Sequence, residues 1–214
     1  MRSHRTLWSA AASTVSLMLL TAAAGNVPSV VAQACSDVEV VFARGAFEPP
    51  GIGGVGSAFV DSLRALKQDR SIDVYAVDYP ATGMQNAVDG ALDASAHIQE
   101  TVGKCPNTRM VLGGYSLGAL AIFFVTGTPT PRFALDQPLP PDIADHVAAV
   151  AAFAVPNNPF TPAPTLSPSY AAKAIDLCIG GDPVCSSGFD LSAHGQYSES
   201  GMTTQAAEFV ASRI

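Results

Sequence analysis

The sequence has little charge, and positive charge is the scarcer kind. Charged residues make up 14% of the 214 residues, with 11 lysines and arginines against 18 acidic residues and a formal net charge of −7. No run of basic residues occurs. Because nucleic-acid-binding surfaces need clustered positive charge, we expect no nucleic-acid partner.

Long apolar runs are absent after residue 34, so no transmembrane helix of roughly 20 residues is expected there. The first 34 residues are different. Arg2 and Arg5 give a positive start, an apolar stretch follows from Leu7 to Ala24, and small residues come after it. Because serines and threonines interrupt this stretch and no charges stop it, we interpret residues 1–34 as a secretory signal peptide, not as an anchor. We therefore expect a secreted protein, free or associated with the cell envelope.

The position of signal cleavage stays open between Ala24 and Ala34. Removal of residues 1–34 takes away two arginines and leaves residues 35–214, with 9 basic and 18 acidic side chains and a net charge of −9. No internal repeat or linker divides this part, and the chain is 48% hydrophobic, which is enough for a sizeable core. We expect residues 35–214 to form one domain.

Cysteine is also scarce, but the four cysteines are an even number in a chain expected to be exported, which predicts two disulfides. Cys178 and Cys185 bracket a Gly-Gly-Asp-Pro turn, so we pair them and leave Cys35 to pair with Cys105. An alternative makes Cys35, directly after Ala34, a lipidated N-terminal cysteine. The residues before it lack the usual lipobox pattern, and lipidation would leave Cys105 unpaired.

Short apolar runs alternate with helical patterns along the chain. The runs lack the polar alternation of a half-exposed strand, which predicts a parallel sheet covered on both faces, a three-layer α/β/α sandwich. Ligands in such folds bind beyond the carboxyl ends of the strands. The expected strands are 38–43, 72–79, 109–114, 146–154 and 171–179, and the expected helices are 55–66, 87–102, 116–125 and 202–214. On the first helix we expect Val55, Phe59, Leu63 and Leu66 to share the buried face.

The segment Gly114-Tyr115-Ser116-Leu117-Gly118 matches the pattern Gly-x-Ser-x-Gly. It joins an expected strand directly to an expected helix, which is the context of the nucleophile elbow in α/β hydrolases. Side chains at the two glycines would clash across so tight a turn. The alternative is a glycine-rich turn with a serine N-cap. We expect Ser116 to be a nucleophile and the fold to be of the α/β-hydrolase type.

A serine needs a base, and His194 is the best candidate. It lies in a polar loop between the last expected strand and the last helix, after the nucleophile, as the order Ser, acid, His requires. His146 enters a strand at its amino end, which is the wrong end of the sheet. His97 precedes Ser116 on a helix, and we expect it on a solvated or packing face.

The acid that orients His194 is expected to be Asp182. It lies just past the carboxyl end of the last strand, between the two cysteines of the expected short disulfide. Asp176 lies inside that strand, and Asp190 is only four positions before His194. Asp182 could instead be an ordinary Asp-Pro turn former.

Backbone amides are expected to bind the oxyanion of the tetrahedral intermediate. One is the amide of Leu117, directly after the nucleophile. The second comes from the glycine- and proline-rich loop after the first strand, where Ala46 is the best candidate.

Several segments follow one another in a characteristic order: "CSDVEVVFARG", "YAVDYPA", "SAHI", "CPNTRMVLGGYSLG", "CIGGDPVC", His194 and "SGMTTQAAEFVASRI". Together they resemble the cutinase family, in particular the cutinase-like proteins of mycobacteria. The resemblance extends over residues 35–214 and implies a fold, a Ser116, Asp182 and His194 triad and two disulfides that agree with the expectations above.

Two positions depart from the family pattern. Ala46 stands where members often have a serine or threonine whose hydroxyl supports the oxyanion, and Leu117 stands where many have glutamine. Leu117 keeps its amide, so this change costs little. Ala46 predicts weaker stabilisation of the transition state, or an oxyanion hole formed by a conformational change. The sequence around His194 also differs from the His-Leu or His-Val that is common in the family.

The resulting hypothesis is a secreted serine carboxylesterase that hydrolyses short- to medium-chain esters or lipids through an acyl-enzyme. It needs no metal or organic cofactor, and we expect a monomer in transient contact with a lipid surface. The segments 47–54, 153–160 and 127–141 are candidates for an apolar acyl site. Two alternatives stay open: a catalytically weak binding or cell-envelope protein on a hydrolase scaffold, and an acyltransferase.

Overall fold

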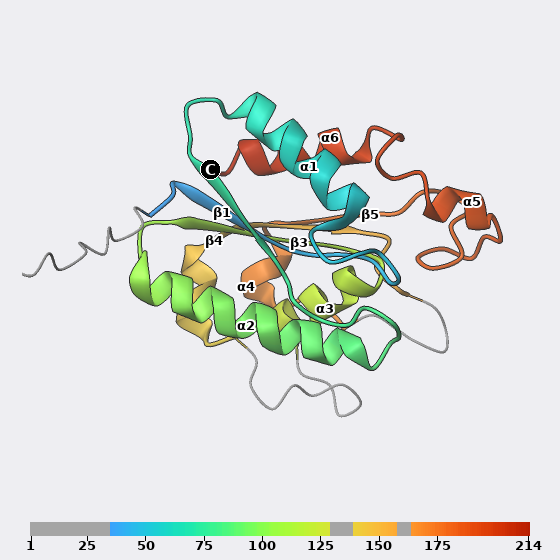
Figure 1. The fold of residues 1–214 in the computed structure, drawn as a ribbon, viewed down its shortest axis with the longest axis horizontal. Coiled ribbons are helices and arrows are strands. Elements are labelled where there is room, and N and C mark those ends of the chain that lie inside the picture. Colours follow the sequence, from blue (N-terminus) through green and yellow to red (C-terminus); the bar gives the residue numbers. More distant parts are fainter. Residues whose placement is uncertain (1–34, 129–138, 158–163) are drawn as a thin grey trace, which may run out of the picture. The chain divides into compact units, whose positions relative to one another are not determined.

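The computed structural model describes residues 35–128, 139–157 and 164–214 (Figure 1). The expected signal peptide, residues 1–34, lies outside the described residues. So do residues 129–138 and 158–163, which include parts of two of the segments expected to line an acyl site. No helix in the described ranges is long and apolar enough to cross a bilayer.

A five-stranded sheet runs through the middle of residues 35–214 (Figure 1). The strands lie in the order β2-β1-β3-β4-β5, and every neighbouring pair is parallel. This confirms the predicted parallel sheet. The strands are β1 (Val38–Ala43), β2 (Ile72–Ala76), β3 (Arg109–Tyr115), β4 (Val147–Phe153) and β5 (Ala174–Leu177).

Helices cover both faces of the sheet, which confirms the predicted sandwich (Figure 1). One face carries α1 (Gly53–Leu66) and α6 (Met202–Ala211). The other face carries α2 (Asn86–Lys104), α3 (Leu117–Thr126), the 3-10 helix η1 (Pro141–His146) and α4 (Pro168–Ala171). A last short helix, α5 (Leu191–His194), lies in the loop between β5 and α6.

The side chains of β1 show how the sequence builds both cores. Val40 and Phe42 pack with α1 and α6, whereas Val41 and Ala43 pack with α2 and α3. Successive residues of a strand point to opposite faces, so an unbroken apolar run serves two layers at once. Helix α3 is buried along its whole length, which explains why its sequence has no polar face.

Two strands are shorter than predicted because hydrogen bonds to other groups end them early. β2 stops at Ala76, not Tyr79, and the amide of Asp78 donates to the carboxylate of Asp93 on α2, 2.8 Å away. β5 covers only Ala174–Leu177, because α4 takes up the residues before it and the amide of Ile179 donates to a tyrosine hydroxyl.

Two details of the helices also differ from the prediction. Leu66 is 48% exposed because it ends α1, and Val60 is buried on that helix in its place. His194, which was expected in an irregular loop, is the last residue of the one-turn helix α5. Asp190 caps this helix by accepting a hydrogen bond from the amide of Ser192.

Both predicted disulfides are present. Cys35–Cys105 joins the residue just before β1 to the end of α2, and Cys178–Cys185 closes the loop after β5. The first pairing is incompatible with the lipidated alternative for Cys35, because its sulfur is already bonded to Cys105.

The two disulfides should contribute differently to stability. Cys35–Cys105 spans 70 residues and Cys178–Cys185 spans 7, so the loop-entropy model assigns them about 4 and about 2 kcal/mol respectively. We expect replacement of Cys35 and Cys105 by alanine to lower the free energy of unfolding by the larger amount, measured by urea denaturation. A larger loss from Cys178→Ala with Cys185→Ala would contradict this ranking.

Candidate active site

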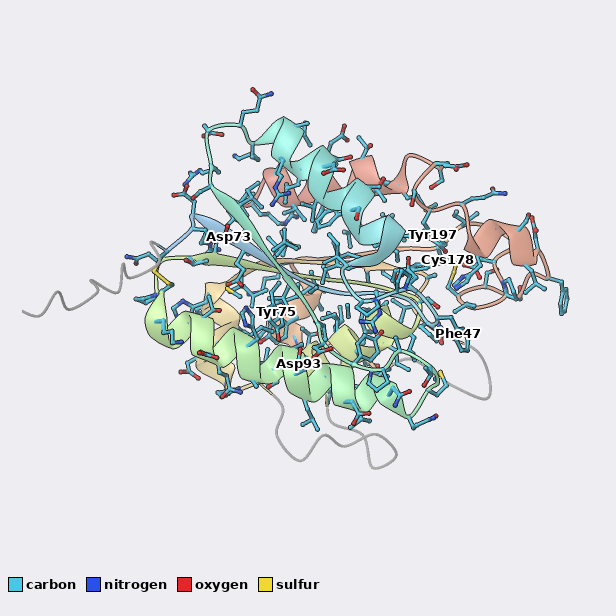
Figure 2. The ribbon with its side chains drawn as sticks, in the orientation of Figure 1. Phe47, Asp73, Tyr75, Asp93, Cys178 and Tyr197 are labelled. Carbon is cyan, nitrogen blue, oxygen red and sulfur yellow. A yellow bond between two sulfur atoms is a disulfide. The ribbon has the colours of Figure 1, made fainter. Side chains whose placement is uncertain are left out.

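The candidate site lies where the strand order reverses. The chain passes from β1 to β2 on one side and then returns to β3 on the other side of β1. The loops after β1 and β3 therefore leave the sheet in opposite directions. Such a switch point is where open α/β sheets bind ligands. Figure 2 shows Phe47, Cys178 and Tyr197 at this end of the sheet, with Asp73 toward the opposite end.

A cavity of about 350 Å³ opens at this end, and every strand contributes to its wall through the loop that follows it. None of the lining side chains is charged, and most are apolar. The lining residues are Ala46, Phe47, Thr82, Gly83, Met84, Ser116, Leu117, Pro156, Pro183 and Val184. The segments 47–54 and 153–160, expected at an acyl site, thus supply Phe47 and Pro156 from their described parts.

Ser116 occupies a strained turn between β3 and α3. Its φ is 55° and its ψ is −116°, a conformation that non-glycine residues rarely adopt. Its amide donates to the carbonyl of Phe153 at the end of β4, 2.8 Å away, and its carbonyl accepts from Leu120 at the start of α3. The turn is therefore held from the sheet and from the helix.

The two glycines of the motif are required by space. A Cβ atom on Gly118 would lie 2.0 Å from the carbonyl oxygen of Ala43, and one on Gly114 would lie 2.5 Å from the carbonyl oxygen of Gly118. In both cases the obstacle is backbone, which cannot move aside. Gly114 and Gly118 thus allow β3, α3 and the end of β1 to meet around the serine.

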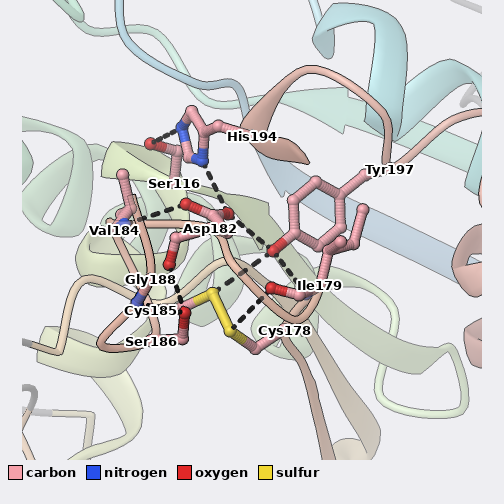
Figure 3. Close-up of a disulfide and its surroundings, with 10 residues drawn as sticks. All are labelled: Ser116, Cys178, Ile179, Asp182, Val184, Cys185, Ser186, Gly188, His194 and Tyr197. Carbon is pink, nitrogen blue, oxygen red and sulfur yellow. Dashed lines mark hydrogen bonds and ion pairs between the residues drawn. A yellow bond between two sulfur atoms is a disulfide. The ribbon is translucent and has the colours of Figure 1, made fainter. Parts of the chain in front are cut away.

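The structure brings together the three residues expected to form a triad (Figure 3). The hydroxyl of Ser116 is 3.0 Å from His194 Nε2, and His194 Nδ1 is 2.8 Å from Asp182 Oδ2. A carboxylate can only accept, so Nδ1 carries a proton and the neutral ring offers Nε2 as an acceptor to the serine hydroxyl. This is the arrangement in which a histidine can take the serine proton.

Asp182 is completely buried, and three donors compensate the loss of water. Oδ1 accepts from the amide of Val184 at 2.8 Å, while Oδ2 accepts from His194 Nδ1 and from the hydroxyl of Tyr197 at 2.8 Å. The bond from Val184, two residues further on, is an Asx turn, so Asp182 does shape its loop as the alternative proposed. Its second oxygen is bonded to His194 and Tyr197, which an ordinary turn former would not require.

Two tyrosines that the sequence analysis did not single out hold His194. The hydroxyl of Tyr115 donates to the carbonyl of His194, and the two rings stack with their centres 5.1 Å apart. Tyr197 meets the imidazole edge-on. Burial, with the nearby charges of Glu48 and Asp182, raises the pKa of Tyr115 to about 12, so its hydroxyl keeps its proton.

The loop that carries Ala46 is held by two further residues that the sequence analysis missed. Arg44 is buried and donates to the carbonyls of Glu48, Val77 and Tyr79. The carboxylate of Glu48 accepts from the amides of Gly45 and Gly54, at 2.6 and 2.8 Å. Their only sequence signal was a charged pair in an otherwise apolar loop.

Backbone strain also concentrates around the cavity. The described residues other than glycine with positive φ are Phe47, Ala81, Ser116 and Ala154, and each follows the carboxyl end of a different strand. The amide of Phe47 donates to the carbonyl of Ala81, 2.8 Å away, which ties two of these loops together. Such strain commonly accumulates at functional sites.

Leu117 and Ala46, whose amides were expected to bind the oxyanion, both line the cavity together with Ser116. Leu117 is the first residue of α3, so its N–H has no partner within the helix. The Ala46 amide makes no backbone hydrogen bond to another described residue. Both are placed where they could donate to a ligand.

The rejected histidines lie elsewhere. His97 lies on α2 with Nε2 2.6 Å from a Glu39 carboxylate oxygen, and its ring stacks on that of Tyr75, which Figure 2 labels between the sheet and α2. His146 ends η1, just before β4 begins, with Nδ1 3.1 Å from the carbonyl of Pro106. Neither is among the residues that line the cavity.

The two carboxylates that were rejected as the acid lie in other structural positions. Asp190 caps α5 through Ser192, and Asp176 lies within β5. Neither is hydrogen-bonded to His194 among the described contacts, whereas Asp182 is.

A parallel sheet covered by helices, with a serine on this strained turn beside a histidine and a buried carboxylate, defines the α/β-hydrolase class. The chain belongs to the cutinase family, because the model of the family described as Cutinase matches residues 34–214.

Curated relatives and a solved structure agree with this membership. The chain is 48% identical to "Carboxylesterase Culp1" of Mycobacterium tuberculosis, over 92% of this chain and 90% of that protein. It is 52% identical to "Phospholipase Culp4" of the same organism, over 84% and 80%. A cutinase of Trichoderma reesei, solved in complex with a C11Y4 phosphonate inhibitor, has a TM-score of 0.65 and 31% identity, covering 82% of this chain and 75% of that one.

The steric role of the glycines can be tested in the folded protein. We expect Gly118→Ala to lower the free energy of unfolding by about 3 kcal/mol or more, since its Cβ meets fixed backbone. Gly103→Ala, on the exposed side of α2 with nothing within 4 Å, is the matched control. It should raise the free energy of unfolding by at most about 1 kcal/mol, because alanine favours a helix more than glycine does. Urea denaturation of both variants measures the difference, and equal stability would refute the steric argument.

Proposed function

We propose that this carboxylic ester hydrolase works through Ser116, His194 and Asp182. Ser116 Oγ attacks the ester carbonyl carbon while His194 Nε2 takes the hydroxyl proton. The tetrahedral intermediate collapses, the proton passes to the departing alkoxide, and an alcohol leaves. Water, deprotonated by His194, then attacks the acyl-enzyme and releases a carboxylic acid and free Ser116.

The observation that carries the proposal is the unbroken hydrogen-bonded chain from Ser116 Oγ to His194 to the buried Asp182, at the floor of an open apolar cavity. A buried carboxylate that faces a histidine stabilises the imidazolium formed in each step. The strained turn exposes the serine oxygen to the cavity without placing it on a mobile loop.

We assign the binding of the oxyanion of the tetrahedral intermediate to the backbone amides of Leu117 and Ala46. Both residues line the cavity next to Ser116, and the start of α3 adds the favourable potential of a helix N-terminus. Ala46 offers no side-chain hydroxyl as an additional donor. Because one lost donor costs about 3 kcal/mol of transition-state stabilisation, we infer slower turnover than in relatives that carry the hydroxyl.

We propose uncharged short- to medium-chain esters as substrates. The cavity wall is apolar and carries no charged side chain among the described lining residues, so nothing there compensates a charged group in the acyl chain. The chain as a whole is acidic, which disfavours anionic substrates further.

Exposed apolar side chains in the loop after β1 and in the loop that carries His194 suit transient contact with a lipid surface. Phe47 is 82% exposed, and in the loop that carries His194, Phe189 is 95% and Leu191 is 79% exposed. Large exposed apolar side chains near a site are a common sign of such contact. With its negative charge, the protein should favour neutral over anionic surfaces.

We also propose that the protein is exported. A signal peptide over residues 1–34, followed by one domain over 35–214, fits the two disulfides, which persist in oxidising compartments. We propose a secreted monomer, free or associated with the cell envelope.

Hydrolysis should depend on Ser116. We expect the purified protein to cleave p-nitrophenyl esters of graded chain length, and Ser116→Ala to lower kcat by at least about 10⁴-fold. A p-nitrophenyl alkylphosphonate should also label the wild-type protein once, releasing p-nitrophenol, and should leave Ser116→Ala unlabelled. Equal rates for the two proteins would favour the weak-binding alternative, and ester products formed with added alcohol would favour the acyltransferase.

The exposed apolar side chains of the loop that carries His194 should matter for lipid surfaces alone. We expect Phe189→Ser combined with Leu191→Ser to lower the rate on an emulsified neutral triacylglycerol by about tenfold, because apolar area that enters the surface is lost. The rate on a soluble short-chain ester should stay unchanged. Leu66→Ser, which removes an exposed apolar side chain at the end of α1, is the control. Equal losses on both substrates would count against surface contact.

A further inference from the structure

Tyr197 lies at the centre of the polar network beneath His194, although it does not line the cavity (Figure 3). It follows His194 by three residues and is completely buried. Its ring packs edge-on against His194 and Phe153 and lies 5.5 Å from the ring of Tyr115. These contacts fix the ring, so its hydroxyl has one position.

The direction of each hydrogen bond at that hydroxyl follows from its neighbours. The amide of Ile179 lies 3.0 Å away and can only donate, so the tyrosine oxygen accepts from it. Cys185 Sγ, at 3.3 Å, carries no proton because it is in a disulfide. The hydroxyl proton therefore goes to Asp182 Oδ2, 2.8 Å away, the strongest acceptor within reach.

Asp182 Oδ2 thus accepts two hydrogen bonds, one from the Tyr197 hydroxyl and one from His194 Nδ1–H. The first fixes the direction of the oxygen and stabilises its charge in a place without water. The second is the bond that orients the imidazole. A buried carboxylate oxygen with only the histidine as partner would be freer to rotate and would be less stable as an anion.

The same hydroxyl also joins the two ends of the disulfide loop. It contacts Ile179, next to Cys178, and Cys185 at the other end, while Asp182 lies between them. Within the loop, the amide of Asp182 donates to the carbonyl of Ile179. The position of the carboxylate is therefore set from the backbone side by the loop and from the oxygen side by Tyr197.

We propose that Tyr197 is a positioning residue for ester hydrolysis, acting through its hydroxyl on Asp182 and through Asp182 on His194. The inference rests on the proposed function of the triad. Tyr197 does not touch the substrate site, so its removal should change kcat and leave KM unaltered.

The groups that face the Asp182–His194 pair determine what a pH profile reports. They are Tyr115 on β3 and Tyr197, and the charge of Glu48, in the loop after β1, acts on Tyr115. Burial raises the pKa of Tyr197, and it raises the pKa of Tyr115 to about 12, so both tyrosines stay neutral over the working range. Glu48 accepts hydrogen bonds from the amide of Gly45 in its own loop and from that of Gly54 at the start of α1, and none of its described hydrogen bonds involves Tyr197.

The test is Tyr197→Phe, which keeps the ring and deletes the hydroxyl. We expect kcat on a soluble p-nitrophenyl ester to fall by about 10- to 100-fold, because the carboxylate loses the bond that fixes its direction and no longer holds the imidazole in line with Ser116. The acid limb of kcat/KM should move to higher pH by about 0.5–1 unit. A less stabilised Asp182 carboxylate takes up a proton at higher pH. It also binds the protonated imidazole of His194 more tightly, so His194 stays protonated to higher pH. Both effects move the acid limb to higher pH.

The matched control is Tyr170→Phe. Tyr170 is also buried, lies on α4 away from the cavity, and its hydroxyl has no hydrogen-bond partner among the described residues. We expect this variant to keep the wild-type kcat and pH profile. Thermal unfolding of both variants separates a loss of stability from a loss of positioning.

The inference is overturned if Tyr197→Phe lowers only Tm, with kcat and the acid limb equal to those of Tyr170→Phe. If Tyr197→Phe does not fold, Tyr197→3-fluorotyrosine decides, because its more acidic hydroxyl donates more strongly. Its acid limb should move to lower pH, and an unmoved limb overturns the inference.

Failure of the proposed function would look different. Wild-type protein would then show no hydrolysis that depends on Ser116. The low-field proton resonance of His194 Nδ1–H would still test the positioning, since it should shift in Tyr197→Phe and stay in place in Tyr170→Phe. An unshifted resonance in Tyr197→Phe counts against Tyr197.

Discussion

The close contact between α3 and the end of β1 is the constraint on which the rest of the site depends. Gly118 brings the first turn of α3 against the carbonyls of Ala43 and Arg44, leaving no space for a side chain. Ser116 must then make the whole turn from strand to helix, which gives it its positive φ. The strain is offset by α3 itself, whose ten residues are all buried in the core.

The other half of the site is built by different means. The loop after β5 is irregular, and a disulfide, backbone bonds and Tyr197 together hold Asp182 in it. His194 lies between these two supports on a one-turn helix, and its side chain is the only partly exposed member of the three, at 25%. The residue that must exchange protons with substrate and water is thus the one that keeps access to solvent.

The sequence predicted most of the fold because its signals are local. An apolar run long enough for a buried strand, followed by a helical pattern, predicts a layer whatever lies beside it, so the order of the elements was right. The predicted ends of β2 and β5 were wrong because side chains of other elements bind the backbone amides that would have extended these strands. The Asp78 amide donates to Asp93, and the Ile179 amide donates to the Tyr197 hydroxyl. Such competition cannot be seen in a single segment.

In the site, too, the residues with a local sequence signal were predicted and those that depend on distant contacts were not. Ser116 has a motif, and Asp182 and His194 could be placed by their positions after the last strand. Tyr197, Arg44 and Glu48 have no motif, because a hydroxyl, a guanidinium or a carboxylate acquires its partners only when distant loops meet. Their contribution is geometric, and geometry of this kind is a property of the folded chain.

The cavity has one further consequence. Each of its walls comes from the loop after a different strand, and the sheet beneath contributes no side chain that reads the ligand. The loops are also bonded to one another, Phe47 to Ala81 and Asn157 to Val184. A change in one wall therefore reaches its neighbour through these bonds, and the shape that a substrate meets depends on the loops as a connected set.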